Sequence, residues 1–301
     1  MKILTYTKAF FLSLLAAFTL TACGGDDDDD GGGKSGTETP KTKNVNANIL
    51  TKKEYGRLEF PKLKGGTSMV LIHSTPEFGL NYSVEWDTSK KSQRWSCFEW
   101  YNSNSGGSAS RYYGDPQYPS DPDLPSSAGW TDYNDPYRGS GYDHGHIVAS
   151  ADRLCSSEMN YQTFFLTNMQ PQRNKFNSGL WSKMEAQVRS WNKSSFRDTL
   201  YVCKGGTIDK PEQILTTTGR GLLVPKYFFM AVLCKNSQGY KTMAFWVEHI
   251  NEDRSTDNLK DYIISIDDLE ERTGIDFFCN LPDEVEDKVE AQIIPSAWGF
   301  K

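Results

Sequence analysis

Side chains that could carry out catalysis gather in residues 142–191. This segment opens with Asp-His-Gly-His at 143–146 and continues to Asn177 and Glu185. Hydrolysis of a phosphodiester needs an activated water, neutralised charge on the phosphoryl oxygens and help for the departing oxygen. A histidine, an amide and a carboxylate at wide spacing supply the groups of a one-metal phosphodiester hydrolase.

His146 and Asn177 are the two residues that we predict to be central. A histidine near its ordinary pKa of about 6.5 can take a proton from water at neutral pH. Mg²⁺ prefers oxygen ligands and keeps several waters, so one amide oxygen together with phosphate oxygens can suffice to hold it. We therefore expect His146 as general base and Asn177 as ligand of Mg²⁺, with Mn²⁺ or another divalent cation as the alternative.

Two of the four histidines of the chain, His144 and His146, flank Gly145. His-x-His spacing alone is a weak indication of zinc, and residues i and i+2 of a strand point to the same side, which allows a joint ligand role. A histidine pair in a turn is more often structural. The residues further along the chain favour the catalytic interpretation.

The order of these motifs resembles the DNA/RNA non-specific endonuclease family with the ββα-metal motif, whose hallmark reads Asp-Arg-Gly-His. In that family the last histidine of the hallmark is the general base, and an Asn-x-x-Pro-Gln segment and a metal-binding asparagine follow it. Here the segment at 168–172 reads Asn-Met-Gln-Pro-Gln. The resemblance covers roughly residues 55–295 and implies His146 as base, Asn168 as a supporting residue of the site and Asn177 as metal ligand.

The same resemblance assigns roles to Glu185 and Arg189. They match the family's glutamate, two helical turns beyond the asparagine, and its arginine one turn further, which implies that Arg189 stabilises the pentacoordinate phosphorus. Eight residues of α-helix give about 12 Å of rise and an offset of about 80°. Asn177 and Glu185 should then not bind one ion directly, and Glu185 should position a metal-bound water. The alternative is an exposed helix glutamate paired with Arg189.

The chain departs from the hallmark at His144, which stands where the family has arginine. Because that arginine is not the base, the change alters local electrostatics more than the reaction. Arg111 is the candidate for the family's phosphate-holding arginine in the upstream loop, although spacing does not settle this assignment. We expect both Arg111 and His144 on the substrate side. Arg111 lies within a loop over residues 102–141 that is rich in Ser, Gly, Pro, Asp and Tyr, and His144 follows it. A plain surface insertion is the alternative for this loop.

Residues 1–22 have the pattern of a signal peptide. Lys2 and Lys8 precede an apolar run over residues 9–22 that is too short to span a bilayer comfortably as a mature helix. The run ends in Leu-Thr-Ala before Cys23, which resembles the bacterial lipoprotein signal, where the cysteine is lipidated and becomes the new N-terminus. A plain secretory signal with a chance cysteine is the alternative.

Residues 23–54 predict a lipidated Cys23 followed by a flexible acidic tether. They contain five consecutive aspartates between glycines and no apolar residue before Val45, so little offsets the entropy of ordering. A calcium loop is not favoured, because its interleaved spacing and closing glutamate are missing. We expect an exported lipoprotein held at the outer membrane or cell surface by its lipid alone, with residues 55–301 as the endonuclease domain.

The formal net charge is −6, and loss of Lys2 and Lys8 with the signal peptide leaves −8. A nucleic-acid binder usually has a basic surface, so the bulk charge counts against DNA and RNA as partners. A local groove can still be basic, and an enzyme that must release its polyanion gains little from high, salt-sensitive affinity. The resemblance implies DNA and RNA as substrates. A non-catalytic binding lipoprotein on the same scaffold and a phosphodiesterase with another substrate remain as alternatives.

The cysteines other than Cys23 are odd in number and form no Cys-x-x-Cys pair, so structural zinc is not favoured and at least one thiol stays unpaired within the chain. Their pairing is not determined by the sequence: Cys97, Cys155, Cys203, Cys234 and Cys279.

Strand patterns cluster, with helical patterns interspersed rather than strictly alternating, which favours an α+β fold with a mixed, mainly antiparallel central sheet flanked by helices. The expected strands are 68–73, 82–86, 92–101, 163–169, 199–203, 227–233 and 241–249. The expected helices begin at Asn177 and near Leu269, the latter ending at Gly274.

Overall fold

The computed structural model describes residue 45 and residues 52–301. The predicted signal peptide, Cys23 and most of the predicted tether lie outside the described residues. The tether prediction extended to residue 54, but a 3₁₀ helix already begins at Lys53 and covers Lys53–Gly56. No helix of residue 45 or residues 52–301 is long and apolar enough to cross a membrane.

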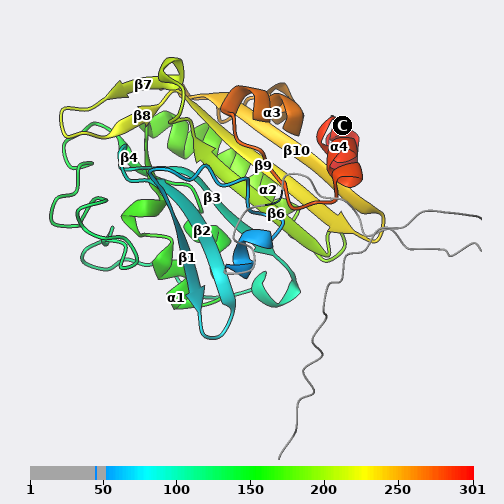
Figure 1. The fold of residues 1–301 in the computed structure, drawn as a ribbon, viewed down its shortest axis with the longest axis horizontal. Helices are drawn as coiled ribbons and strands as arrows, with labels where there is room; N and C mark the ends of the chain where they lie inside the picture. The colour runs from blue at the N-terminus through cyan, green and yellow to red at the C-terminus, as the bar shows by residue number, and fades with distance from the viewer. Residues whose placement is uncertain (1–44, 46–51) are drawn as a thin grey trace, which may run out of the picture. The chain divides into compact units, whose positions relative to one another are not determined.

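One antiparallel sheet of seven strands forms the centre of the fold, in the order β1-β2-β3-β6-β9-β10-β11 (Figure 1). Its strands are β1 Ser68–Thr75, β2 Gly79–Asp87, β3 Ser92–Trp100, β6 Thr199–Gly206, β9 Tyr227–Asn236, β10 Gly239–Glu248 and β11 Ile263–Ile264. Two-stranded sheets are formed by β4 Asp143–His146 with β5 Met169–Gln172, and by β7 Ile214–Thr217 with β8 Leu223–Pro225. The α-helices are α1 Ser157–Gln162, α2 Ser182–Ser190, α3 Ile266–Thr273 and α4 Asp283–Glu290. The α+β prediction is confirmed.

Both faces of the central sheet are covered, because side chains alternate along each strand. In β9, Phe228, Met230 and Val232 join the core that contains the apolar side chains of α2. Phe229 and Ala231 join the opposite core, which contains those of α3 and α4. Double burial explains why β9 is an almost continuous apolar run in the sequence.

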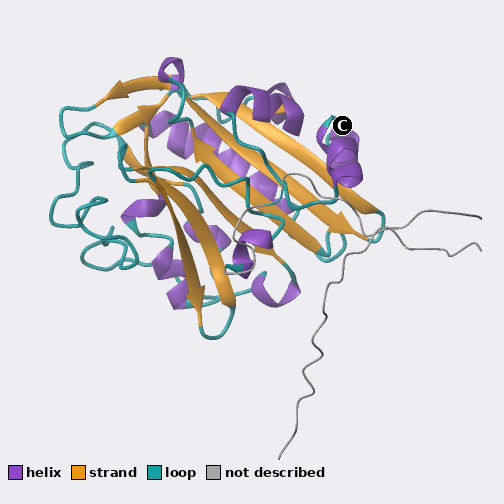
Figure 2. Ribbon diagram, viewed as in Figure 1, coloured by secondary structure: helices purple, strands orange, loops and turns teal. Residues whose placement is uncertain are grey.

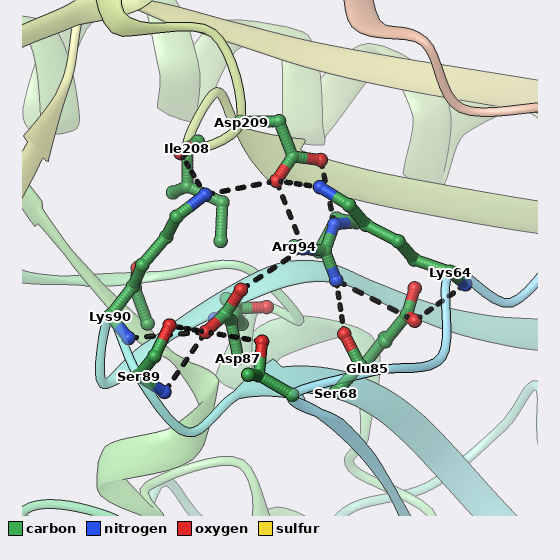
Figure 3. Close-up of polar contacts among 12 residues, drawn as sticks. Lys64, Ser68, Glu85, Asp87, Ser89, Lys90, Arg94, Ile208 and Asp209 are labelled. Carbon is green, nitrogen blue, oxygen red and sulfur yellow. Dashed lines mark hydrogen bonds and ion pairs between the residues drawn. The ribbon is translucent and has the colours of Figure 1, made fainter.

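An ionic network surrounds the buried side chain of Arg94 (Figure 3). The guanidinium of Arg94 on β3 donates two hydrogen bonds to the carboxylate of Asp209, at 2.7 and 2.9 Å, and one to Asp87 at 3.2 Å. Lys64 and Lys90 also bind Asp209, at 2.7 and 3.1 Å. The network ties the segment after β6 to the β1–β3 part of the sheet.

The strand predicted over 163–169 is wrong. A 3₁₀ helix occupies Leu166–Asn168, and the strand β5 begins only at Met169 and includes Pro171. Proline is tolerated there because β5 pairs with β4 alone, so the missing N–H breaks no second ladder. The predicted loop over 102–141 is drawn almost entirely as loop in Figure 2, and it contains one 3₁₀ turn, Asn102–Asn104.

The helix predicted from Asn177 is also different at its start. A π-helical turn covers Phe176–Trp181 and leads into α2 at Ser182. Asn177 is therefore the second residue of this turn and not the N-cap of an α-helix. The rise and offset calculated for a continuous α-helix between Asn177 and Glu185 do not apply, since a π turn holds more residues per turn. Such turns occur frequently at functional sites.

Candidate active site

The β4–β5 ladder fixes the backbone of the Asp-His-Gly-His segment. Gly145 lies opposite Gln170, and a Cβ added at Gly145 would lie 2.3 Å from the side chain of Gln172 and 2.7 Å from the carbonyl oxygen of Gln170. The glycine is therefore required by the close approach of β5. It lets the two strands pair while His144 and His146 project to one side.

Asn168 anchors the end of this ladder and does not line the cavity. Its side chain is fully buried, its Oδ1 accepts from the N–H of Val148 at 2.9 Å, and its Nδ2 donates to the carbonyls of Val148 and Thr163 at 2.9 and 2.7 Å. These bonds fix the chain directly after His146. Asn168 therefore acts on the site by positioning the backbone.

The imidazole of His146 packs edge-on against Phe164, with ring centroids 4.8 Å apart. Its Nε2 is buried and has no hydrogen-bond partner among the described residues. Burial lowers the pKa of His146 to about 3, and the positive charge of Arg111 adds to this effect. The ring is thus neutral at physiological pH and offers a lone pair. The carbonyl of His146 accepts a hydrogen bond from Trp181 Nε1 at 3.1 Å, which links β4 to the π turn.

Asn177 is oriented by the first residue of the hallmark segment. Asp143 Oδ2 accepts hydrogen bonds from Asn177 Nδ2 and from Asn174 Nδ2, both at 3.1 Å. With its Nδ2 held in this way, the carboxamide of Asn177 has its Oδ1 left as the ligand atom. This is the type of atom that Mg²⁺ prefers.

One cavity of about 680 Å³ brings together six of the predicted site residues. They are Arg111, His144, His146, Asn177, Glu185 and Arg189. The cavity is lined by two arginines, Arg111 and Arg189, and by two carboxylates, Asp143 and Glu185, so its charges are balanced although the chain as a whole is acidic.

Glu185 lies in the first turn of α2 and faces a buried lysine. Its Oε1 is buried without a hydrogen-bond partner in the described chain, and Lys204 Nζ of β6 lies 3.5 Å from it. Burial raises the pKa of Glu185, against the attraction of Lys204. The alternative of an exposed glutamate paired with Arg189 is wrong: the Glu185 side chain is 12% exposed, and Arg189 pairs instead with Asp152.

Asp152 and Lys204 were missed by the sequence analysis. Asp152 binds Arg189 through Oδ1, and its Oδ2 lies 3.4 Å from Lys204 Nζ, so the three residues and Glu185 form one charge chain. The available signal was a lysine inside the apolar run of β6. A buried lysine must be paired, and its partners are usually carboxylates of the same site.

His144 is clamped between two aromatic rings. It stacks on Tyr118 at 3.7 Å and on Tyr137 at 4.2 Å between centroids, and its Nε2 lies 2.9 Å from Asp135 Oδ2. The ring therefore attaches the 102–141 loop to β4. Arg111 lies on the same loop with its guanidinium 4.7 Å from the centroid of Phe164, beside His146.

The cavity fits a divalent cation, since an amide oxygen, a buried carboxylate and a buried imidazole nitrogen without partners share it. Zinc held by the two histidines does not fit, because His144 Nε2 is engaged with Asp135 and its ring lies inside an aromatic stack. Elsewhere in the described chain, two groups of acidic or histidine ligands approach one another, and neither contains His146 or Asn177.

Comparisons with known proteins agree with this geometry. The DNA/RNA non-specific endonuclease family matches residues 70–284. A nuclease of Nostoc sp. is 31% identical over 222 residues, which cover 70% of this chain and 76% of that protein. The chain belongs to the DNA/RNA non-specific endonuclease family.

More distant relatives are similar over shorter shares of their length. The mitochondrial nuclease EXOG of Xenopus laevis is 27% identical over 67% of this chain, which spans 58% of that protein, and the nuclease of Serratia marcescens is 23% identical over 53% of this chain and 60% of that one. A structure of an EndoG/EndoGI complex shares the fold, with a TM-score of 0.59 and 17% identity over 73% of this chain and 91% of the other.

Family membership confirms the predicted function class, that of an endonuclease acting on DNA and RNA. It makes the protein a hydrolase of nucleic acids, and the family generally uses a divalent metal ion. Of the cysteines whose pairing the sequence left open, Cys97, Cys155, Cys203 and Cys234 form no disulfide in the structure.

Proposed function

We propose that this protein is a Mg²⁺-dependent endonuclease that cleaves DNA and RNA with little preference for base or sugar. We also propose that it acts at the outer membrane or cell surface, where a lipid on Cys23 tethers it. The observation that carries the catalytic part is the shared cavity of His146 and Asn177, in which each presents a ligand or base atom without a competing partner. The tether rests on the sequence of residues 1–54.

Asn177 Oδ1 would hold the cation, with Asp143 keeping the carboxamide in the productive orientation. A bound Mg²⁺ would neutralise charge on the phosphate and on the departing oxygen. Because Mg²⁺ keeps several waters, Glu185 would accept hydrogen bonds from these waters. Lys204 fixes the position of the Glu185 carboxylate.

His146 would take the proton of the attacking water at Nε2. Its low pKa in the free protein has burial as its main cause and the charge of Arg111 as the second. A phosphate of the substrate beside Arg111 would offset that charge and make the imidazole more basic once the substrate is bound. His146 would therefore be a stronger base in the substrate complex than in the free protein.

Arg189, which lines the cavity, would stabilise the negative charge that develops on the oxygens of the pentacoordinate phosphorus, and Asp152 binds its guanidinium. Arg111 would bind a neighbouring phosphate. Phosphate is common to DNA and RNA, whereas contacts with base edges would specify sequence. None of the roles predicted for the cavity residues involves a base edge, which supports low specificity.

Substitution of His146 by alanine tests the catalytic assignment. Loss of a general base should lower the rate of plasmid and RNA cleavage by roughly 10²–10⁴-fold, while the thermal unfolding midpoint should not fall, because Nε2 makes no hydrogen bond that the variant would lose. EDTA should abolish cleavage by the unmodified protein, and Mg²⁺ should restore it. Full activity of the His146→Ala protein would refute the role.

The rival functions are separated by the same assay. A non-catalytic binding lipoprotein would retain nucleic acid without cleaving it under any metal condition. A phosphodiesterase for small substrates would leave plasmid DNA intact and cleave an activated phosphodiester. For the tether, Cys23→Ser should move the protein from the membrane to the soluble fraction, and its retention in the membrane would contradict lipidation.

A further inference from the structure

A second cavity, of about 450 Å³, is lined only by carboxylate side chains. They come from α3, from the segment that follows it and from α4, and Figure 1 shows these two helices next to each other beside β10. The apolar side chains of α3 and α4 belong to the core on one face of the sheet, and those of α2 to the core on the other. The acidic cavity and the active-site cavity share no residue.

Three of these carboxylates converge closely. Ligand oxygens of Asp267, Glu270 and Glu290 all lie within 4.8 Å of one another. Negative charges this close to one another repel. In the described chain, no lysine, arginine or histidine forms an ion pair with any of the three. Their mutual repulsion is therefore not balanced by a basic side chain.

Glu290 provides the independent indication of a ligand. The residue is only 4% exposed, it lines the acidic cavity, and its Oε1 is buried with no hydrogen-bond partner among the described residues. A buried carboxylate oxygen without a partner costs free energy unless a ligand satisfies it. Burial and the negative charge of Glu270 raise the pKa of Glu290 to about 10, which is the expected consequence of such crowding.

We propose that Asp267, Glu270 and Glu290 form a binding site for a hard divalent cation, with Ca²⁺ as the preferred ion. All donors are carboxylate oxygens, which excludes the nitrogen and sulfur ligands typical of zinc. Ca²⁺ binds oxygens at 2.3–2.6 Å, so two oxygens bound to one ion lie at most about 4.6–5.2 Å apart. The three ligand oxygens lie within 4.8 Å of one another, so one Ca²⁺ can reach all three. Mg²⁺ demands near-ideal octahedral geometry and keeps several of its waters, whereas Ca²⁺ accepts a flexible set of carboxylates.

The bound ion would connect the start of α3 with the end of α4. Asp267 lies in the first turn of α3 and Glu290 is the last residue of α4. The ion would therefore stabilise the packing of the C-terminal helices and take no part in cleavage. Because Asp267 is exposed and the cavity opens to solvent, we expect an affinity in the range of extracellular calcium modules, with Kd of about 10⁻⁴–10⁻³ M.

The test uses the Asn177→Ala protein, so that the active-site ligand does not contribute to binding. After treatment with EDTA and dialysis, CaCl₂ is titrated into this protein in a calorimeter, and thermal unfolding is followed with and without CaCl₂. The matched protein carries Glu290→Gln in addition, which keeps the side-chain shape and removes the charge. Glu248→Gln on β10, outside both cavities, is the control substitution.

We expect one saturable calcium site and a calcium-dependent rise in Tm for the Asn177→Ala protein and for its Glu248→Gln derivative. Glu290→Gln should weaken calcium binding roughly tenfold or more, because the number of charged ligands sets the affinity, and should remove the rise in Tm. Identical titrations with and without Glu290→Gln would overturn the proposal. So would a Tm that depends on pH but not on calcium, since the carboxylates would then be satisfied by protons alone.

Discussion

The pH dependence of folding stability should depend strongly on His73. This β1 residue is 2% exposed, and its Nε2 and Nδ1 lie 3.1 and 3.4 Å from carboxylate oxygens of Asp121 and Asp123. Burial lowers its pKa, but the interactions with the two nearby carboxylates outweigh burial and raise the pKa to about 9. Asp121 also accepts a hydrogen bond from Thr167, so protonated His73 attaches the 102–141 loop to the sheet.

The size and sign of the effect follow from this pKa. A rise from 6.5 to about 9 favours the charged form in the folded state by roughly 3 kcal/mol. Because the folded pKa is higher than the unfolded one, this stabilisation is fully present below pH 6.5 and is lost as the pH rises through 9. His249 should have the opposite effect. Burial lowers its pKa to about 4, so the folded state loses stability as the pH falls from 6.5 to 4.

Urea unfolding of the unmodified protein and of His73→Gln between pH 6 and 9.5 measures the contribution. The difference between the two unfolding free energies should shrink by roughly 3 kcal/mol from pH 6.5 to 9. The comparison is needed because Glu270, whose pKa is raised to about 8 by burial, also reduces stability as the pH rises. A difference that stays constant with pH would refute the argument, because His73 would then be neutral in the folded state.

Three further outcomes are expected. Lys204→Met should lower the unfolding free energy by roughly 3–5 kcal/mol in urea titrations, because two buried carboxylates lose their countercharge; unchanged stability would contradict the charge chain. Asp209→Asn should also lower the unfolding free energy by roughly 3–5 kcal/mol, because the buried Arg94 guanidinium loses a carboxylate partner. As a control, Lys64→Ala removes an exposed side chain of the same network and should lower the unfolding free energy by less than about 1 kcal/mol. Gly145→Ala should lower kcat for plasmid cleavage by about 10²-fold, because β5 must move away from the new Cβ; normal kcat would show that the ladder does not set the position of the base.

The sequence predicted the residue types of the site and their order along the chain. His146, Asn177, Glu185 and Arg189 lie on two short segments whose local structure is fixed by strand pairing and by helical turns, so their spacing carries most of the information. The strands of the central sheet were predictable for a similar reason: β9 and β10 are buried on both faces and are rich in apolar residues.

Only the tertiary structure decided how these groups are paired. Lys204 lies on β6 and Asp152 lies in the turn after β4. Their positions in the sequence do not indicate that their side chains form an ion pair. The partner of Arg189 and the clamp on His144 depend in the same way on contacts between distant segments. The sequence thus determined which groups are available for catalysis. Their partners, burial and pKa values were decided by packing, because electrostatic interactions depend on distance in space and not on separation along the chain.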